Sequence, residues 1–416
     1  MDIEVFWCPF GTLRALGQGN RRRQQSKTVR WRMGWDGIVN TLQLLDNLIA
    51  FPTVSRDSNL DLIEFVRSFL LVRGVASQLF MDARGRKANL FATIGPQDRG
   101  GILLSGHTDV VPVDGQDWRS DPFRMIERGG ALYGRGTADM KGFIAAALAA
   151  ADRATRRTLR APLHLALSYD EEIGCVGVRS MIEAMAQWKV RPRLCIVGEP
   201  TMLRPAIGHK GKTALRAVCS GHAIHSSLAP QGVNAIHLAS DLIQRIRALQ
   251  DRIEGCGKRD ADFEVPYTTL HVGIIHGGVA LNIVPDHCEL EVEIRNMPDE
   301  APQPLIDAIR AEASALLHSP RGAIELSIMN DYPSLATPAD AEVVELVSRA
   351  TGEHQRIKVG FGSEAGLFSA QLSIPCVVCG PGSINDAHRP DEFVTLEQLQ
   401  RCDAMLDSVL DTLSAP

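Results

Sequence analysis

Three short apolar runs in this chain each lead directly into histidine or acidic side chains. The runs and the residues that follow them are 102–105 with His107 and Asp109, 163–168 with Glu171 and Glu172, and 194–197 with Glu199. Apolar runs of this length, bounded by polar residues and glycine, are typical of buried strands. In an open α/β sheet the carboxyl ends of the strands border one ligand crevice. The pattern therefore predicts that these side chains converge there.

Strand-like and helical segments alternate along most of the chain, which favours an α/β fold with a mixed, largely parallel sheet and helices on both faces. The order of the predicted elements changes between 213 and 329, where strand, helix, strand, strand, helix and strand follow one another. This is the order of a ferredoxin-like α+β unit. We therefore predict one domain formed by 35–206 and 331–416, interrupted by an inserted domain at 207–330.

The composition is that of a globular protein, with 45% hydrophobic and 22% charged residues. A net charge of -5 does not favour nucleic acid or an anionic membrane as partner, and no apolar run is long enough to span a bilayer. Nine scattered cysteines predict reduced thiols and a cytoplasmic location. Cys376 and Cys379 have the spacing of a redox motif, but we interpret them as buried strand residues.

Residues 1–34 differ from the rest, because Arg21–Arg32 is strongly basic and has little apolar periodicity. One interpretation is a basic arm for nucleic acid or a transit peptide. The other is a disordered basic extension, or upstream codons read through to Met33, and we favour this second interpretation.

Three further candidates lie in loops. Asp139 ends a glycine-rich loop and precedes an apolar helical pattern, so it is either a ligand or a plain helix cap. Glu171 and Glu172 leave a predicted strand in opposite directions, so one could bind a metal while the other acts as a base, unless both belong to a solvated loop. His388 lies in a loop rich in glycine and proline that follows the apolar run 374–379.

Together these residues form a set of two histidines and three carboxylates without cysteine. The predicted metal ligands are His107, Asp139, Glu172, Glu199 and His388. Imidazole and carboxylate ligands suit Zn²⁺, Co²⁺ or Mn²⁺ and argue against a structural thiolate site. Two metals need a bridging carboxylate, and Asp139 is the natural bridge. Asp109 is placed to orient His107.

These motifs resemble those of the dinuclear zinc aminoacylase and peptidase family, which includes acetylornithine deacetylase, succinyl-diaminopimelate desuccinylase and carboxypeptidase G-type enzymes. The resemblance extends over nearly the whole chain from about Trp35 onward. Within the family, several stretches are most similar to the acetylornithine deacetylases, namely LYGRGTADMKGF (132–143), GHKGK (208–212), GVNAI (232–236), HGGVALN (276–282) and GPGSINDAHRPDE (380–392).

The resemblance implies a zinc-peptidase-like catalytic domain with two divalent metal ions per subunit, Zn²⁺ or Co²⁺. The two implied ligand sets are His107, Asp139 and Glu199 for one ion, and Asp139, Glu172 and His388 for the other. The resemblance also implies that Asp109 orients His107 and that Glu171 is the general base.

For the inserted domain, the resemblance implies a lid that also forms a homodimer. His225 matches a histidine that reaches the active site of the partner subunit. Asn282 and Arg295 match positions that hold the oxyanion region and the carboxylate of the substrate, although Arg295 could also be an ordinary surface residue.

The implied reaction is hydrolysis of N-acetyl-L-ornithine to L-ornithine and acetate in arginine biosynthesis. The nearest alternative is an amidohydrolase for another N-acyl amino acid, or a succinyl-diaminopimelate desuccinylase. Two interpretations from other classes are a catalytically dead scaffold that binds a ligand or stores zinc, and nucleic-acid binding through Arg21–Arg32. The complete set of predicted ligands argues against the scaffold.

Overall fold

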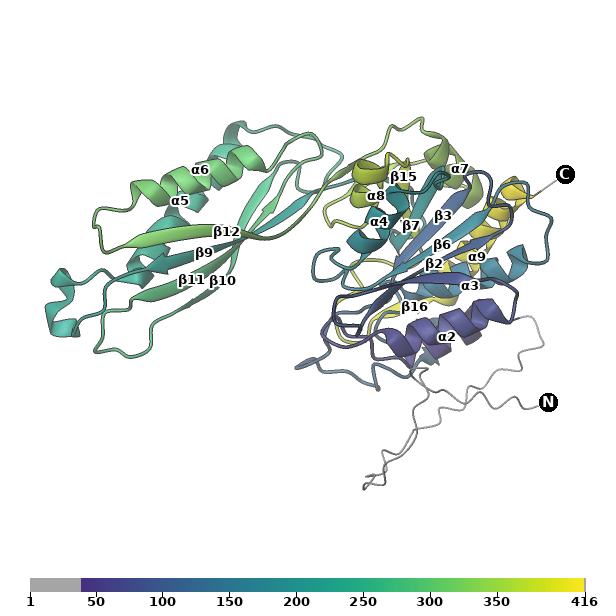
Figure 1. Cartoon of the computed structure of the whole chain (residues 1–416), viewed down its shortest axis with the longest axis horizontal. Helices are drawn as coiled ribbons and strands as arrows, with labels where there is room; N and C mark the ends of the chain where they lie inside the picture. Colours follow the sequence, from purple (N-terminus) through teal and green to yellow (C-terminus); the bar gives the residue numbers. More distant parts are fainter. Residues whose placement is uncertain (1–38, 415–416) are drawn as a thin grey trace, which may run out of the picture. The chain divides into compact units, whose positions relative to one another are not determined.

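The computed structural model describes residues 39–414, which form two main sheets (Figure 1). The predicted basic extension at 1–34 lies outside the described residues. The strands of the larger sheet are β1 (Ser77–Met81), β2 (Ala88–Ile94), β3 (Ile102–His107), β6 (Leu163–Ser168), β7 (Leu194–Pro200), β8 (Ala206–His209), β13 (Leu335–Ala336), β14 (Ile357–Val359) and β15 (Cys376–Gly380). Three short strands pair separately, namely β4 (Ile126–Arg128), β5 (Ala131–Tyr133) and β16 (Phe393–Thr395).

The larger sheet has the order β1-β2-β6-β3-β7-β15-β8-β13, with β14 beside β8. Its four central strands, β6, β3, β7 and β15, are parallel, whereas β1, β2 and β13 pair antiparallel to their neighbours. The prediction of a mixed α/β fold is thus confirmed, with the parallel strands gathered at the centre. A parallel centre brings the carboxyl ends of four strands to one edge.

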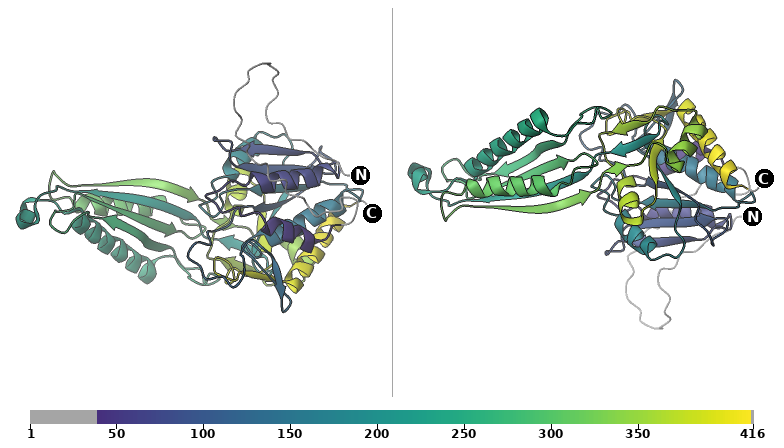
Figure 2. Two further views of the ribbon diagram at one scale, coloured as in Figure 1. Left: turned by 90° about the horizontal axis from the view of Figure 1, so that it is seen from below. Right: turned by 90° about the horizontal axis from the view of Figure 1, so that it is seen from above.

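Helices cover both faces of this sheet (Figures 1 and 2). The helices are α1 (Thr41–Ile49), α2 (Leu60–Leu71), α3 (Lys141–Ala154), α4 (Val178–Ala186), α7 (Glu342–Thr351), α8 (Ala365–Leu372) and α9 (Leu396–Leu413). Helices α4 and α8 share one apolar core with β3, β7 and β15, and Cys376 and Cys379 are fully buried in β15, as predicted. Helix α9 packs between α3 and α7. No helix in the described part of the chain is long and apolar enough to cross a membrane.

The smaller sheet is formed by β9 (Lys212–Ser220), β10 (Thr269–Gly277), β11 (His287–Arg295) and β12 (Ala323–Tyr332), in the order β10-β11-β9-β12. Its strands are all antiparallel. Helices α5 (Ala235–Cys256) and α6 (Gln303–Ala315) cover one face. The sequence order is that of a split βαβ unit. The sheet has an apolar core of its own, and the boundaries 207 and 330 of an inserted domain stay a prediction.

Helix α3 approaches the larger sheet closely, because a glycine lies beneath it. The helix is rich in alanine and nearly all of its residues are buried, so its small side chains allow tight packing on every side. At Gly198 in β7, an added Cβ atom would lie 1.9 Å from Cγ of Phe143. The absent side chain at Gly198 therefore sets how near the start of α3, and Asp139 just before it, lies to Glu199.

Replacing Gly198 by alanine should destabilise the fold, because the ring of Phe143 has to move out of a close-packed core. We expect the free energy of unfolding to fall by about 1–3 kcal/mol, measured as a lower urea midpoint and thermal midpoint. Gly360→Ala is the matched control, since nothing lies within 4 Å of the added Cβ atom there. Equal midpoints for the two variants would contradict the close-approach argument.

Candidate metal centre

All the predicted ligands lie at the carboxyl edge of the central parallel strands. His107 is the last residue of β3, Glu199 lies near the end of β7, and Glu172 follows β6. His388 lies in the loop after β15, and Asp139 immediately precedes α3. The carboxyl ends of these strands therefore bring together side chains that are up to 281 residues apart in the chain (His107 to His388).

Asp139 lies between the two histidines. Its Oδ1 atom is 2.9 Å from Nε2 of His107, and its Oδ2 atom is 3.0 Å from Nε2 of His388. Glu199 Oε1 is 3.6 Å from the same His107 nitrogen, and Glu172 Oε2 is 3.2 Å from Nε2 of His388. One carboxylate thus contacts two imidazoles on opposite sides, which is the arrangement that a bridge between two cations requires.

Two groups of three candidate ligand atoms lie within 4.8 Å of one another. They are His107 with Asp139 and Glu172, and His107 with Glu171 and Glu199. The second group contains Glu171, which the sequence assigned to proton transfer. Glu171 is therefore close enough to the ligands to act on a molecule bound between them, and its role as a base stays a prediction.

The residues present fit a pair of cations. Glu172 Oε1 and Glu199 Oε1 are buried and have no hydrogen-bond partner among the described residues. Burial raises the pKa of Glu171 to about 8 and that of Glu172 to about 7, and charge repulsion from Asp139 adds to both shifts. Buried, unpartnered carboxylates that repel one another are costly, and a divalent cation converts that repulsion into attraction.

Asp139 itself is held in the charged form. Burial opposes its ionisation, but hydrogen bonds from His107 and His388 outweigh that effect and hold the pKa of Asp139 below its usual value. A carboxylate that keeps its charge in a buried site has both oxygens available as metal ligands.

Asp109 contacts both His107 and the loop that carries the two glutamates. Nδ1 of His107 is 2.9 Å from the main-chain oxygen of Asp109 but 3.6 Å from its carboxylate. The carboxylate instead accepts from the backbone amides of Glu171 and Glu172, at 3.1 and 3.3 Å, and from the Ser55 hydroxyl at 2.8 Å. The main chain of Asp109 therefore contacts the His107 ring and its side chain holds the loop that carries the two glutamates, while its role in orienting His107 stays a prediction.

A buried ion pair that was not predicted from the sequence lies beneath Asp139. Arg135 Nη1 and Glu392 Oε2 are 2.6 Å apart, and both side chains are about 1% exposed. Glu392 Oε1 also accepts from the backbone amides of Ala138 and Asp139, at 2.9 and 3.0 Å. The pair therefore fixes the loop that presents Asp139. The sequence did contain a hint of this ion pair, because Arg135 and Glu392 belong to the two loops that also carry Asp139 and His388.

The candidate residues of the smaller sheet are not brought together. Arg295 ends β11 and donates to Glu293 at 2.8 Å and to the Tyr332 hydroxyl at 2.8 Å. His225 and Asn282 lie beyond the other end of the sheet, where the amide of Ser226 donates to the Asn282 carbonyl at 3.0 Å. The strands between the two ends are nine residues long, so Arg295 lies roughly 25 Å from His225 and Asn282.

Comparison with known proteins gives one family. The model of peptidase family M20/M25/M40 matches residues 103–412. The acetylornithine deacetylase of Pasteurella multocida (strain Pm70) is 35% identical over 381 residues, which cover 90% of this chain and 98% of that protein. The acetylornithine deacetylase of Myxococcus xanthus is 37% identical over 372 residues, which cover 87% and 94%.

Solved structures agree on the fold. The M20 family metallo-carboxypeptidase Sso-CP2 from Sulfolobus solfataricus superposes with a TM-score of 0.74 at 20% identity, over 89% of this chain and 98% of that one. The YXEP protein of Bacillus subtilis, described as a dinuclear metal binding peptidase from the M20 family, gives 0.63 at 16% identity, over 90% and 97%.

Removing the shared carboxylate should empty both predicted cation positions. We expect Asp139→Ala to lose most of its bound zinc or cobalt, because both histidines lose their common partner. The measurement is metal content per chain after gel filtration, and Asp386→Ala, on the same loop as His388, is the control. If Asp139→Ala kept its full metal content, Asp139 would not be a bridge.

Proposed function

The chain belongs to peptidase family M20/M25/M40, and on that premise we propose that it is a metal-dependent amide hydrolase that converts N-acetyl-L-ornithine to L-ornithine and acetate. The family supports the hydrolysis of an amide bond, and the relatives described above support this substrate. The observation that carries the proposal is the Asp139 carboxylate between His107 and His388, at 2.9 and 3.0 Å. The proposed place in metabolism is arginine biosynthesis, in the cytoplasm.

Two divalent cations, Zn²⁺ or Co²⁺, would be held by the five ligands predicted from the sequence. They are His107, Asp139, Glu172, Glu199 and His388. Bound cations would polarise the amide carbonyl and lower the pKa of the attacking water. Asp139 is the only one of the five that contacts both histidines, so it is the proposed shared ligand.

Glu171 is the proposed general base and acid. Its backbone amide is held by Asp109 and its Oε1 atom accepts from the Cys175 thiol at 3.3 Å, so the side chain is held beside His107 and Glu199. It takes a proton from water as the water oxygen bonds to the amide carbon. It then gives that proton to the departing nitrogen as the C–N bond breaks, which leaves acetate and a free amine.

We propose that His225 completes the active site of a second copy of this chain. His225 is exposed, and its Nδ1 atom accepts from the amide of Ser227 at 3.2 Å. The other ring nitrogen, Nε2, can then carry a proton and donate it in a hydrogen bond to an oxyanion. The segment just before Asn282 carries exposed apolar side chains, with Val279 89% exposed and Leu281 100% exposed. An exposed apolar patch of this kind favours a protein interface.

Asn282 and Arg295 are assigned to different subunits of that dimer. Asn282 lies beside His225, so it would approach the oxyanion region of the same partner site. Arg295, at the other end of β11, would bind the carboxylate of the substrate in its own subunit, since a guanidinium pairs well with a carboxylate.

The reaction is tested by assaying acetate release from N-acetyl-L-ornithine by the purified chain. We expect activity to disappear after chelation and to return when Zn²⁺ or Co²⁺ is added. Turnover on other N-acetyl amino acids and on N-succinyl-diaminopimelate separates the lead substrate from the nearest alternatives. A chain that keeps full activity without divalent cations, or that prefers one of the other substrates, contradicts the proposal.

The role of His225 is tested by mixing two inactive variants. Glu171→Ala should lose about 10²–10⁴-fold in rate and His225→Ala about 10²–10³-fold, and both should keep their metals. In a mixed dimer, the site with intact Glu171 receives intact His225 from its partner. Mixing equal amounts should therefore restore about a quarter of the normal activity, since half of the dimers are mixed and each has one complete site.

The matched control is a mixture of Glu171→Ala with Glu171→Gln, which has no complete site in any dimer. Loss of metal from His225→Ala would show that this histidine is a ligand. Failure of the first mixture to regain activity, with exchange of subunits demonstrated, would show that His225 acts within its own chain.

A further inference from the structure

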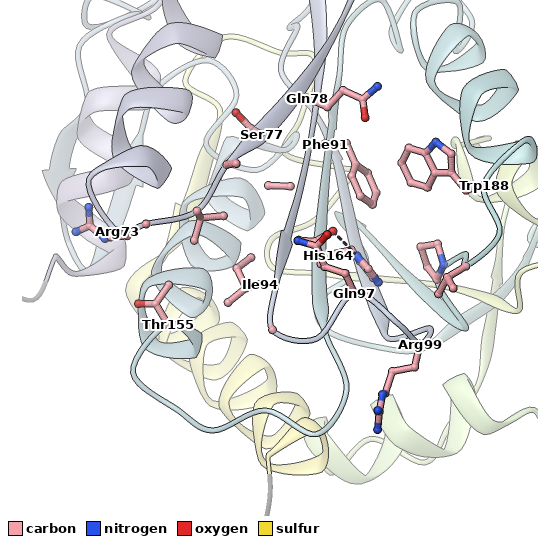
Figure 3. A pocket seen from close by; sticks show the side chains of 18 residues that line it. Arg73, Ser77, Gln78, Phe91, Ile94, Gln97, Arg99, Thr155, His164 and Trp188 are labelled. Carbon is pink, nitrogen blue, oxygen red and sulfur yellow. Dashed lines mark hydrogen bonds between the residues drawn. The ribbon is translucent and has the colours of Figure 1, made fainter.

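A cavity of about 690 Å³ lies at the edge of the larger sheet opposite the metal centre (Figure 3). His164, near the start of β6, lines it, whereas Glu171 and Glu172 follow the end of the same strand. The cavity has the volume of an ordinary small-molecule site. Neither the proposed reaction nor its ligands use any residue of this cavity.

Two buried polar atoms in this cavity lack a partner. His164 is only 6% exposed, and its Nδ1 atom is 3.0 Å from the Thr93 hydroxyl, which leaves Nε2 without a hydrogen bond among the described residues. The hydroxyl of Ser77, which also lines the cavity, is buried and has no hydrogen-bond partner within residues 39–414. Unpartnered buried polar groups are uncommon in folded proteins, so a pair of them in one cavity points to a ligand that hydrogen-bonds.

The wall beside His164 is aromatic. Phe91 packs edge-on against Trp188, with ring centroids 4.7 Å apart, and its centroid is 5.5 Å from the His164 ring. Phe91 is nearly buried, whereas Trp188 is partly exposed in the cavity (Figure 3). Burial lowers the pKa of His164 to about 4, so its ring is neutral near pH 7. A ligand with a flat, uncharged ring and polar edge atoms could stack on the aromatic side chains and hydrogen-bond with the neutral His164 ring.

A second cavity, of about 430 Å³, shares Arg99 with the first. Arg160, Arg193 and Arg349 also line it, together with Glu342. Glu342 is 2.6 Å from Arg193, and Asp98 is 2.8 Å from Arg99.

Two arginines of this second cavity have no acidic partner. Within residues 39–414, Arg160 and Arg349 form no ion pair with an acidic side chain, and the Arg160 guanidinium donates only to the Thr412 carbonyl, at 3.1 and 3.3 Å. Counted with the paired Arg99 and Arg193, the cavity keeps an excess of positive charge. Guanidinium groups bind phosphate through paired hydrogen bonds, so the ligand of this cavity is expected to be a phosphate group.

We propose that the two cavities together form a second small-molecule site, in which the first holds a flat heteroaromatic ring and the second holds a phosphate group, as in a nucleoside monophosphate. The ring lies against Trp188 and hydrogen-bonds with Nε2 of His164, while the phosphate meets Arg160 and Arg349.

The experiment is calorimetric titration of the metal-loaded full chain with AMP, adenosine and inorganic phosphate. AMP should bind at least about tenfold more tightly than either fragment, because it engages both cavities at once. Trp188→Ala should weaken AMP and adenosine by about tenfold and leave phosphate unchanged. The double variant Arg160→Ala and Arg349→Ala should weaken AMP and phosphate and leave adenosine unchanged.

Two controls separate this site from its surroundings. Arg157→Ala removes an arginine close to Arg160 in sequence that pairs with Asp411 and does not line the cavity, so it should bind AMP normally. Asp139→Ala should also bind AMP normally, which excludes phosphate binding to the metals. The proposal is overturned if AMP does not saturate the chain at millimolar concentrations, if phosphate alone binds as tightly as AMP, if the Trp188 and arginine variants bind AMP normally, or if Asp139→Ala abolishes binding.

Discussion

The crowding of buried carboxylates at one edge of the central strands is the constraint to which the surrounding structure is adapted. Asp139 keeps its charge there because His107 and His388 donate to it, while the pKa values of Glu171 and Glu172 rise. The loops that carry Asp139 and the two glutamates are tied by hydrogen bonds from their backbone amides to the carboxylates of Glu392 and Asp109, which limits how far these acids can move apart. Bound cations would relieve the repulsion, and their binding would then be linked to the stability of this edge.

Most of the fold could be predicted from apolar periodicity, because the long elements bury a whole run or one regular face. Strand β6 begins and ends at the predicted residues, 163–168. The strands β8, β13 and β14 were not predicted. They are two to four residues long, too short for any period to be visible, and they exist because distant segments pair with them.

The candidate site was predictable to the extent that strand ends determine position. His107, Asp139 and His388 meet as expected, because they lie at or just beyond the ends of neighbouring elements. The support of the site could not be predicted in the same way. The Asp109 carboxylate and the Glu392 carboxylate both accept hydrogen bonds from backbone amides. Nearly every residue has such an amide, so the sequence does not show which one is the partner. Pairing a buried arginine with an acid more than 250 residues away likewise requires knowledge of the folded loops.

The contact between Gly198 and Phe143 couples two positions that are far apart in the chain. A methyl group at 198 and a phenyl ring at 143 cannot occupy the same space. A substitution of Gly198 by a larger residue is therefore not tolerated while Phe143 is unchanged. A related chain that carries alanine or serine at the first position would need a smaller side chain at the second, acquired before or together with it. The distance between the start of α3 and β7 therefore depends on both residues together. Positions 143 and 198 should accordingly covary in an alignment of homologous sequences.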